Sequence, residues 1–259
     1  MKKTAVITGA YGVIGKAICE MMAEKDFALI LIGRDALQLQ NTCDEISKQT
    51  GNFDIRPAVV DLSCEEEIKR FTKELNEDIS VLINNAGTTP QQRLETPEGI
   101  EMQWATNVLG YVWMKRYLQP RIVSGGRIVN VASFYAGSLD IHDVEFKKRS
   151  YDNDTAYRQS KQANRMLSQY FAEEFKPYNI AVNSCHPGEI SSKLSNNLGF
   201  NFPDPPRKGA DTPVWLATSE EVNNMTGKYF EYRKLTPCQF CKNTDEIKAL
   251  YKLCLSYFK

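Results

Sequence analysis

Histidine is scarce in this sequence, with two residues among 259. It is the side chain that most often carries general acid–base catalysis. With so few histidines, other residue types that could move a proton deserve a close look.

An excess of one charge and a long hydrophobic run are also lacking. Lys and Arg together number 32, as do Asp and Glu, so the charge balance does not favour a nucleic-acid partner. The amino-terminal apolar run in MKKTAVITGA breaks at Gly9, and it is too short for a signal peptide or a membrane span. We therefore expect a cytoplasmic protein without a membrane anchor.

The cysteines show no framework for disulfides or metal. Seven are scattered along the chain, an odd number, in a protein long enough to fold without cross-links. We expect reduced thiols. Cys238 and Cys241 form one C-x-x-C, but no second Cys/His pair follows at zinc spacing and no thioredoxin-like strand precedes it. We therefore expect no metal site.

Short β-branched runs alternate with longer segments of helical periodicity. The runs lie at 4–10, 27–33, 55–62, 79–87, 126–133 and 180–188. Continuous apolar strands that alternate with helices indicate an α/β fold, a parallel sheet with helices on both faces. No repeat or linker interrupts the pattern, so residues 1–259 are expected to form one domain. Two irregular segments, 138–152 and 189–209, follow expected strands, where such sheets bind ligands.

The first strand runs into a glycine-rich loop. Gly9, Gly12 and Gly15 lie in TGAYGVIG, immediately before the amphipathic KAICEMMAEK. Glycines let the backbone approach a pyrophosphate closely, and the helix that follows offers free N–H groups. The pattern favours nucleotide binding over a purely structural turn.

The second strand ends in Gly33-Arg34-Asp35. NAD-binding proteins usually place a carboxylate here to hold the ribose 2′-hydroxyl. Arg34 can instead receive the 2′-phosphate of NADP in a forked contact, and Asp35 can be explained as the N-cap of the next helix. We therefore expect NADP(H) to be preferred over NAD(H).

A phenol and an ammonium lie four residues apart in TAYRQSK. The segment 154–176 has helical periodicity, with Asp154 or Thr155 as a possible cap, so Tyr157 and Lys161 share one helix face. A nearby cation lowers the pKa of a tyrosine and adapts it to acid–base work near neutral pH. Taken alone, the pair is also compatible with an ordinary solvated helix surface.

Taken together, TGAYGVIG, the NNAG of 84–87, Asn107, Ser133 and Tyr157-x-x-x-Lys161 resemble the short-chain dehydrogenase/reductase family over essentially the whole chain. The stretches AYRQSKQANRMLSQYFAEEF and TGKYFEYRK, with the carboxyl-terminal DEIKALYKLCLSYF, resemble its retinol-dehydrogenase-like branch. The resemblance implies a Rossmann-like, doubly wound domain with seven parallel strands. It also implies an NADP(H)-dependent activity that interconverts a hydrophobic or aromatic carbonyl compound and its alcohol, a small-molecule substrate.

The resemblance also assigns roles to individual residues. Tyr157 is the general acid or base, Lys161 lowers its pKa and holds the nicotinamide ribose, Ser133 binds the substrate oxygen, and Asn107 supports a proton-relay water. The implied cofactor-binding residues are Gly9, Tyr11, Gly12, Val13, Ile14, Gly15, Arg34, Asp61, Leu62, Asn85, Ala86, Gly87, Tyr157, Lys161, Pro187 and Gly188. Tyr11 departs from the branch, which usually has asparagine there.

A homodimer is possible, because the family often pairs the helices expected at 97–118 and 154–176. Their outward faces are expected to carry Trp104, Val108, Val112, Phe171 and Phe175. Two alternative functions remain: a catalytically idle nucleotide-binding sensor or scaffold, which typically loses the tyrosine or lysine, and a lyase or epimerase, which usually has a further substrate domain.

Overall fold

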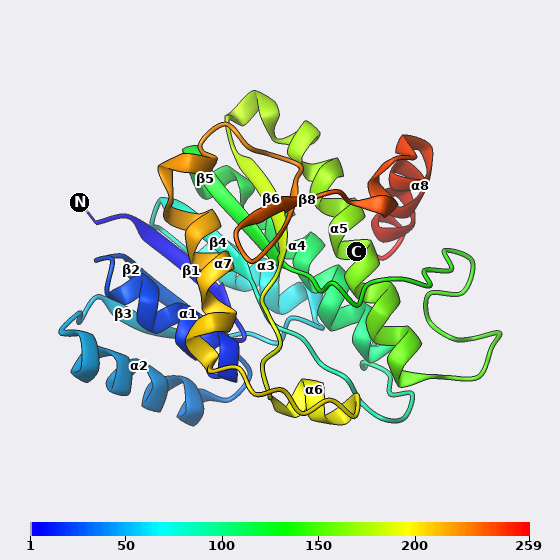
Figure 1. Cartoon of the computed structure of the whole chain (residues 1–259), viewed down its shortest axis with the longest axis horizontal. Coiled ribbons are helices and arrows are strands. Elements are labelled where there is room, and N and C mark those ends of the chain that lie inside the picture. The colour runs from blue at the N-terminus through cyan, green and yellow to red at the C-terminus, as the bar shows by residue number, and fades with distance from the viewer. Residues whose placement is uncertain (1) are drawn as a thin grey trace.

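Eight strands form one sheet in the computed structural model, which describes residues 2–259 (Figure 1). The order across the sheet is β3-β2-β1-β4-β5-β6-β7-β8. The strands are β1 (Thr4–Thr8), β2 (Ala28–Gly33), β3 (Ile55–Val59), β4 (Ile79–Asn84), β5 (Ile122–Val131), β6 (Ala181–His186), β7 (Tyr229–Glu231) and β8 (Lys234–Thr236). The predicted α/β fold with a parallel sheet is confirmed.

The expected number of strands was one too few. Strands β1 to β7 are parallel, and β8 pairs antiparallel with β7 at the sheet edge. The hairpin turns at Tyr232 and Arg233, whose φ angles are 49° and 59°. A two-residue hairpin turn needs such left-handed residues and usually takes Asn or Gly, so this turn lacks the usual sequence signal.

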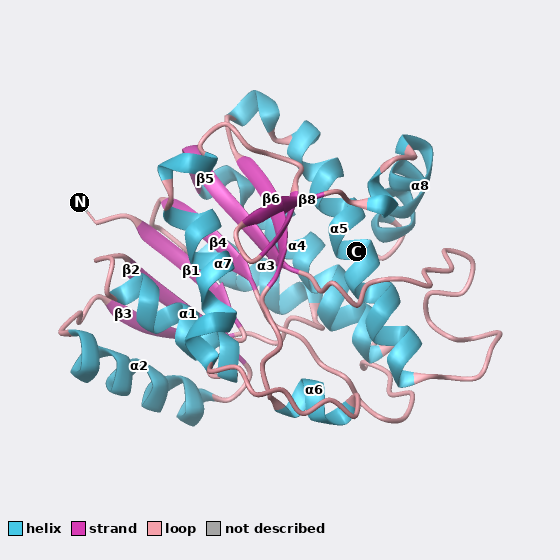
Figure 2. Ribbon diagram, in the orientation of Figure 1, coloured by secondary structure: helices cyan, strands magenta, loops and turns pink. Residues whose placement is uncertain are grey.

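Helices cover both faces of the sheet (Figure 2). The helices are α1 (Val13–Ala23), α2 (Ala36–Thr50), α3 (Glu65–Glu74), α4 (Gly110–Leu118), α5 (Asn153–Glu174), α6 (Lys193–Asn197), α7 (Pro206–Thr218) and α8 (Thr244–Leu255). One apolar core lies between the sheet and α1, α2 and α7, and the other lies under α3, α4, α5 and α8. Strands β1, β2 and β4 are apolar on both sides because both faces are buried, whereas β3 and β8 at the sheet edges are half-buried or exposed.

The start of α5 is capped by a residue that the periodicity did not indicate. The Asp152 carboxylate accepts the backbone N–H of Thr155 at 2.8 Å, so the expected caps Asp154 and Thr155 lie inside the helix. The aspartate satisfies an amide that the first helical turn leaves free.

The faces expected to be outward on the two long helices are inside the protein. Trp104, Val108, Val112, Phe171 and Phe175 are all buried in the core. The carboxyl-terminal helix α8 packs on α5, where the rings of Tyr170 and Tyr251 stack 3.9 Å apart. These apolar residues therefore serve the chain's own core.

Cys238 and Cys241 are joined in a disulfide, with their Cα atoms 5.3 Å apart. The expectation that all cysteines are reduced thiols is therefore wrong for this pair. A short helical turn, Gln239–Cys241, brings the two side chains together. The other five cysteines are free.

No helix within residues 2–259 has both the length and the apolar composition needed to cross a bilayer.

Candidate active site

The glycine loop joins β1 to α1 at the carboxyl edge of the sheet. A Cβ on Gly15 would lie 2.0 Å from the carbonyl oxygen of Gly9, and Gly9 itself has a φ of 66°. Only glycine fits at these two positions. Gly12 precedes α1, whose amino end has no side-chain cap and no acidic residue in its first turn. Free N–H groups there suit an anionic group.

A pocket of about 990 Å³ opens over this loop. Twelve of the predicted cofactor residues line it: Gly9, Tyr11, Gly12, Val13, Ile14, Gly15, Arg34, Asp61, Leu62, Asn85, Ala86 and Gly87. The other four, Tyr157, Lys161, Pro187 and Gly188, do not line it, and Pro187 and Gly188 are buried beyond the end of β6. In the part of the chain that the structure describes, no three His, Cys, Asp or Glu side chains gather in a metal-binding group.

Arg34 stands at the pocket wall where β2 ends, with its side chain 59% exposed and one loose ion pair, 3.9 Å, to Asp61. The Asp35 carboxylate turns away to cap α2, and it accepts the Gln38 amide N–H at 3.0 Å. This bond lowers the pKa of Asp35. The structure thus confirms the N-cap interpretation of Asp35 and leaves a largely free guanidinium beside the pocket.

Tyr11 fills space that Gly33 provides. A Cβ on Gly33 would lie 2.3 Å from the Tyr11 ring, so a side chain at that position would collide with the phenol. The tyrosine that departs from the branch is therefore packed against the end of β2, and it forms part of the pocket wall.

The Asn85–Gly87 segment is fixed to β1 by hydrogen bonds with Thr8. The Thr8 hydroxyl accepts the amide N–H groups of Asn85 and Ala86, at 2.9 and 3.1 Å. The side-chain amide of Asn85 donates to the carbonyl oxygen of Thr8 at 3.0 Å. The backbone that lines the middle of the pocket is thus held rigidly.

Tyr157 and Lys161 lie on one face of α5, as predicted, and both are buried. The Lys161 ammonium is 5.6 Å from the centre of the Tyr157 ring and donates to the carbonyl oxygen of Val131 at 2.9 Å. It would also lie 4.0 Å from a Cβ on Gly87. The lysine therefore lies next to a residue that lines the pocket.

Burial dominates the titration of this pair. It raises the pKa of Tyr157 to about 12, and a hydrogen bond with Ser133 acts in the opposite direction. Burial also lowers the pKa of Lys161 to about 8. The pKa of Tyr157 is therefore raised, not lowered as expected, and Tyr157 carries its proton at neutral pH.

Asn107 lies in a π-helical turn, Trp104–Leu109, that leads into α4. Its side-chain oxygen accepts the Thr88 N–H at 2.8 Å, and its amide donates to the Thr88 carbonyl at 3.0 Å. Its own carbonyl accepts the Asn164 side chain at 3.0 Å. The π turn, a feature common at functional sites, thus joins the β4 edge to α5 beside Lys161.

Several pocket residues were not predicted. Thr88 and Thr89 follow the NNAG motif, and Thr106 lies in the π-helical turn. The others belong to α6 or its cap: Ser192, Lys193, Leu194 and Asn197. The Leu194 side chain would contact a Cβ on Gly87 at 3.2 Å. The irregular composition of 189–209 indicated a ligand segment, but it did not show which residues close over the pocket.

Comparison with known proteins identifies the family of this chain. The family profile described as short chain dehydrogenase matches residues 3–200. The chain is a short-chain dehydrogenase. Mouse (Mus musculus) retinol dehydrogenase 13 is 28% identical over 96% of this chain and 81% of its own length. A Streptomyces sp. (strain C5) protein named as a candidate daunorubicin C-13 ketoreductase is 30% identical over 91% and 85%. The chain thus lies on the retinol-dehydrogenase-like branch and is an oxidoreductase of carbonyl and alcohol groups.

Solved structures agree on the fold of this dehydrogenase. An uncharacterized protein from Mycobacterium Paratuberculosis superposes with a TM-score of 0.81 at 23% identity, covering 98% of this chain and 92% of its own. A short chain dehydrogenase from Burkholderia cenocepacia J2315 in complex with NADP gives 0.72 at 20% identity, over 88% and 95%. The family uses a nicotinamide cofactor, and the pocket residues above suit one.

The dehydrogenase carries aromatic rings around Ser133, here called the aromatic cluster: Phe134, Tyr135, His186, Phe200, Phe202 and Tyr232. Neighbouring rings in it have centres 4.7–6.3 Å apart. Phe134 and Tyr232 are 46% and 48% exposed. The cluster joins the end of β5 to the 189–209 segment and to the β7–β8 turn, so it offers an apolar surface beside Ser133.

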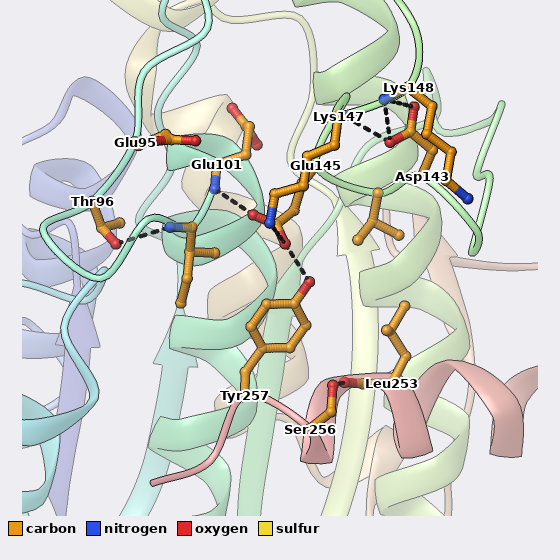
Figure 3. Close-up of polar contacts among 12 residues, drawn as sticks. Glu95, Thr96, Glu101, Asp143, Glu145, Lys147, Lys148, Leu253, Ser256 and Tyr257 are labelled. Carbon is orange, nitrogen blue, oxygen red and sulfur yellow. Dashed lines mark hydrogen bonds and ion pairs between the residues drawn. The ribbon is translucent and has the colours of Figure 1, made fainter.

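The other predicted substrate segment, 138–152, is tied down by two carboxylates (Figure 3). Asp143 accepts the backbone N–H groups of Lys147, Lys148 and Arg149. Glu145 accepts the Glu101 N–H at 3.0 Å and the Tyr257 hydroxyl at 2.8 Å (Figure 3). The segment is therefore an ordered loop, and its position depends on residues after α8.

Proposed function

We propose that the protein is an NADP(H)-dependent oxidoreductase that interconverts a hydrophobic or aromatic carbonyl compound and its alcohol. The observation that carries the proposal is the meeting of two features at Gly87. Gly87 lines the pocket over the glycine loop, and Lys161 and Asn107 approach the same residue from α5 and the π-helical turn.

Residues of the pocket would hold the cofactor in order along its length. Arg34 would bind the 2′-phosphate, Asp61 the adenine, and the glycine loop the pyrophosphate. Asn85 to Gly87, with Pro187 and Gly188, would border the nicotinamide, and Lys161 would hold its ribose. When bound, the cofactor supplies or accepts the hydride.

The protein's own residues handle the proton. Tyr157, protonated at neutral pH because its pKa is about 12, donates its hydroxyl proton to the carbonyl oxygen in reduction. Ser133 binds the same oxygen. The Lys161 ammonium stabilises the phenolate that results. In alcohol oxidation the proton moves in the opposite direction.

Two observations support the finer parts of the proposal. The largely free guanidinium of Arg34 suits the extra phosphate of NADP, which forms strong paired hydrogen bonds with arginine. The aromatic cluster supports a hydrophobic or aromatic substrate, because apolar and aromatic side chains with a few polar groups typically form such binding sites. The idle sensor is not favoured, since both Tyr157 and Lys161 are in place.

The experiment is an NADPH-consumption screen over aldehydes, ketones, steroids and retinoids, followed by Tyr157→Phe on the best substrate. The substitution removes only the hydroxyl, so turnover should fall by at least about 10²-fold while NADPH binding stays nearly intact. Lys161→Ala should damage both. A Tyr157→Phe protein that keeps most of the parent turnover would assign the proton transfer to another group.

A further inference from the structure

Arg165 continues the catalytic face of α5. It follows Tyr157 and Lys161 at the same four-residue spacing, which keeps all three side chains on one side of the helix. Arg165 is 5% exposed. Its guanidinium donates to the backbone carbonyl of Ser133 and, at 2.5 Å, to the Tyr229 hydroxyl. The arginine thus contacts the residue expected to bind the substrate oxygen.

The main chain at Ser133 lies just past the sheet. β5 ends at Val131, and the Ala132 N–H still donates to the Cys185 carbonyl at 2.8 Å. At Ser133 the carbonyl is bonded by Arg165, while the hydroxyl accepts the Tyr135 N–H at 3.1 Å. The arginine therefore fixes the serine where the strand ladder ends.

Burying the Arg165 guanidinium is energetically unfavourable, because the charge loses its contact with water. The guanidinium lies 3.5 Å from the centre of the Tyr229 ring, and Glu231 is a loose ion partner at 3.9 Å. Burial lowers the pKa of Arg165, a sign that the charge has lost much of its hydration. A buried charge with such partial compensation is weak evidence of a stabilising role, because an apolar side chain of similar volume often serves as well.

We propose that Arg165 is a positioning residue that acts through Ser133: it holds the serine's peptide so that the hydroxyl faces Tyr157. Tyr229 supports it by stacking under the guanidinium and by accepting one of its hydrogen bonds. The inference rests on the proposed function, in which Ser133 binds the reacting oxygen.

The test is a double-mutant cycle of Arg165→Met and Ser133→Ala, read as kcat at saturating NADPH and substrate. Arg165→Met alone should lower kcat by about 10²-fold, the scale for a misplacement of about 1 Å, with NADPH affinity nearly unchanged. In the Ser133→Ala background it should lower kcat little further, because residues that act as a unit are not additive. Full additivity, or parental kcat in Arg165→Met, overturns the proposal.

Arg127→Met is the matched control. Arg127 also donates to a backbone carbonyl, that of Leu216 at 3.1 Å, but from within β5 and away from Ser133. It should leave kcat per folded molecule unchanged. If Arg165→Met does not fold, Arg165→Lys and Tyr229→Phe are each combined with Ser133→Ala in its place. Full additivity with Ser133→Ala, or parental kcat in the single variants, again overturns the proposal.

A crystal structure of Arg165→Met beside the parent gives a readout without turnover. The Ser133 hydroxyl should move away from Tyr157, and an unmoved serine overturns the proposal. If the parent turns over no carbonyl compound, the proposed function fails, and the displacement of Ser133 still decides the positioning.

Discussion

Arg34 is the residue on which cofactor choice is expected to depend. If its guanidinium binds the 2′-phosphate, NADPH gains one or two charge-assisted hydrogen bonds, each worth roughly 1.5–3 kcal/mol. Arg34→Ala should remove most of the preference for NADPH over NADH in fluorescence titrations. Arg56→Ala, which removes an arginine of the neighbouring strand β3 that pairs with Glu77, should not. Equal affinity for both cofactors in the parent contradicts the assignment.

Lys161 is expected to set the pH dependence of carbonyl reduction. Below its pKa of about 8 the ammonium is present to stabilise the phenolate, and above it the charge is lost. Tyr157 keeps its proton throughout this range, since its pKa is about 12. The kcat for reduction should therefore be level at neutral pH and fall as the pH rises past about 8. A kcat that rises through this range would show that Lys161 acts in another way.

Helix α8 is expected to contribute to the apolar core and so to the stability of the fold. Leu250 on this helix is fully buried, whereas Leu255 at its end is 42% exposed. Leu250→Ala should lower the free energy of unfolding by about 2–5 kcal/mol, the usual range for a buried leucine. Leu255→Ala should change it by less than about 0.5 kcal/mol. Urea unfolding of both variants measures these changes in the free energy of unfolding. Equal decreases in the two variants would mean that α8 is not docked as described.

Some strands and helices could be predicted from the sequence, and others could not. Strands β1 to β6 follow from short apolar runs, which are a local pattern; β3 is among them although it is only half-buried. Strands β7 and β8 do not, because each has three residues and their turn uses Tyr232 and Arg233. The glycine loop and the Tyr157–Lys161 face are also local. The closure of Leu194 over Gly87 and the bond from Arg165 to Ser133 join distant segments, so no local pattern shows them.

Helix α8 makes a dimer through α4 and α5 less favourable than the sequence indicated. The apolar residues that would pair two copies through α4 and α5 are buried within one chain. A dimer across this face would have to displace α8. Light scattering at micromolar concentration should therefore give the mass of one chain, 29.4 kDa. Twice that mass would mean that the chain associates through another surface.

The docking of α8 also bears on how the protein is made. The ribosome produces the chain from its amino end, so α5 emerges well before residues 244–255. Until they follow, the aromatic side of α5 near Phe171 and Tyr170 lacks the helix that covers it in the folded protein. Apolar surface exposed in this way makes a folding intermediate prone to aggregate. The nascent protein should thus depend on chaperones until its last helix is released.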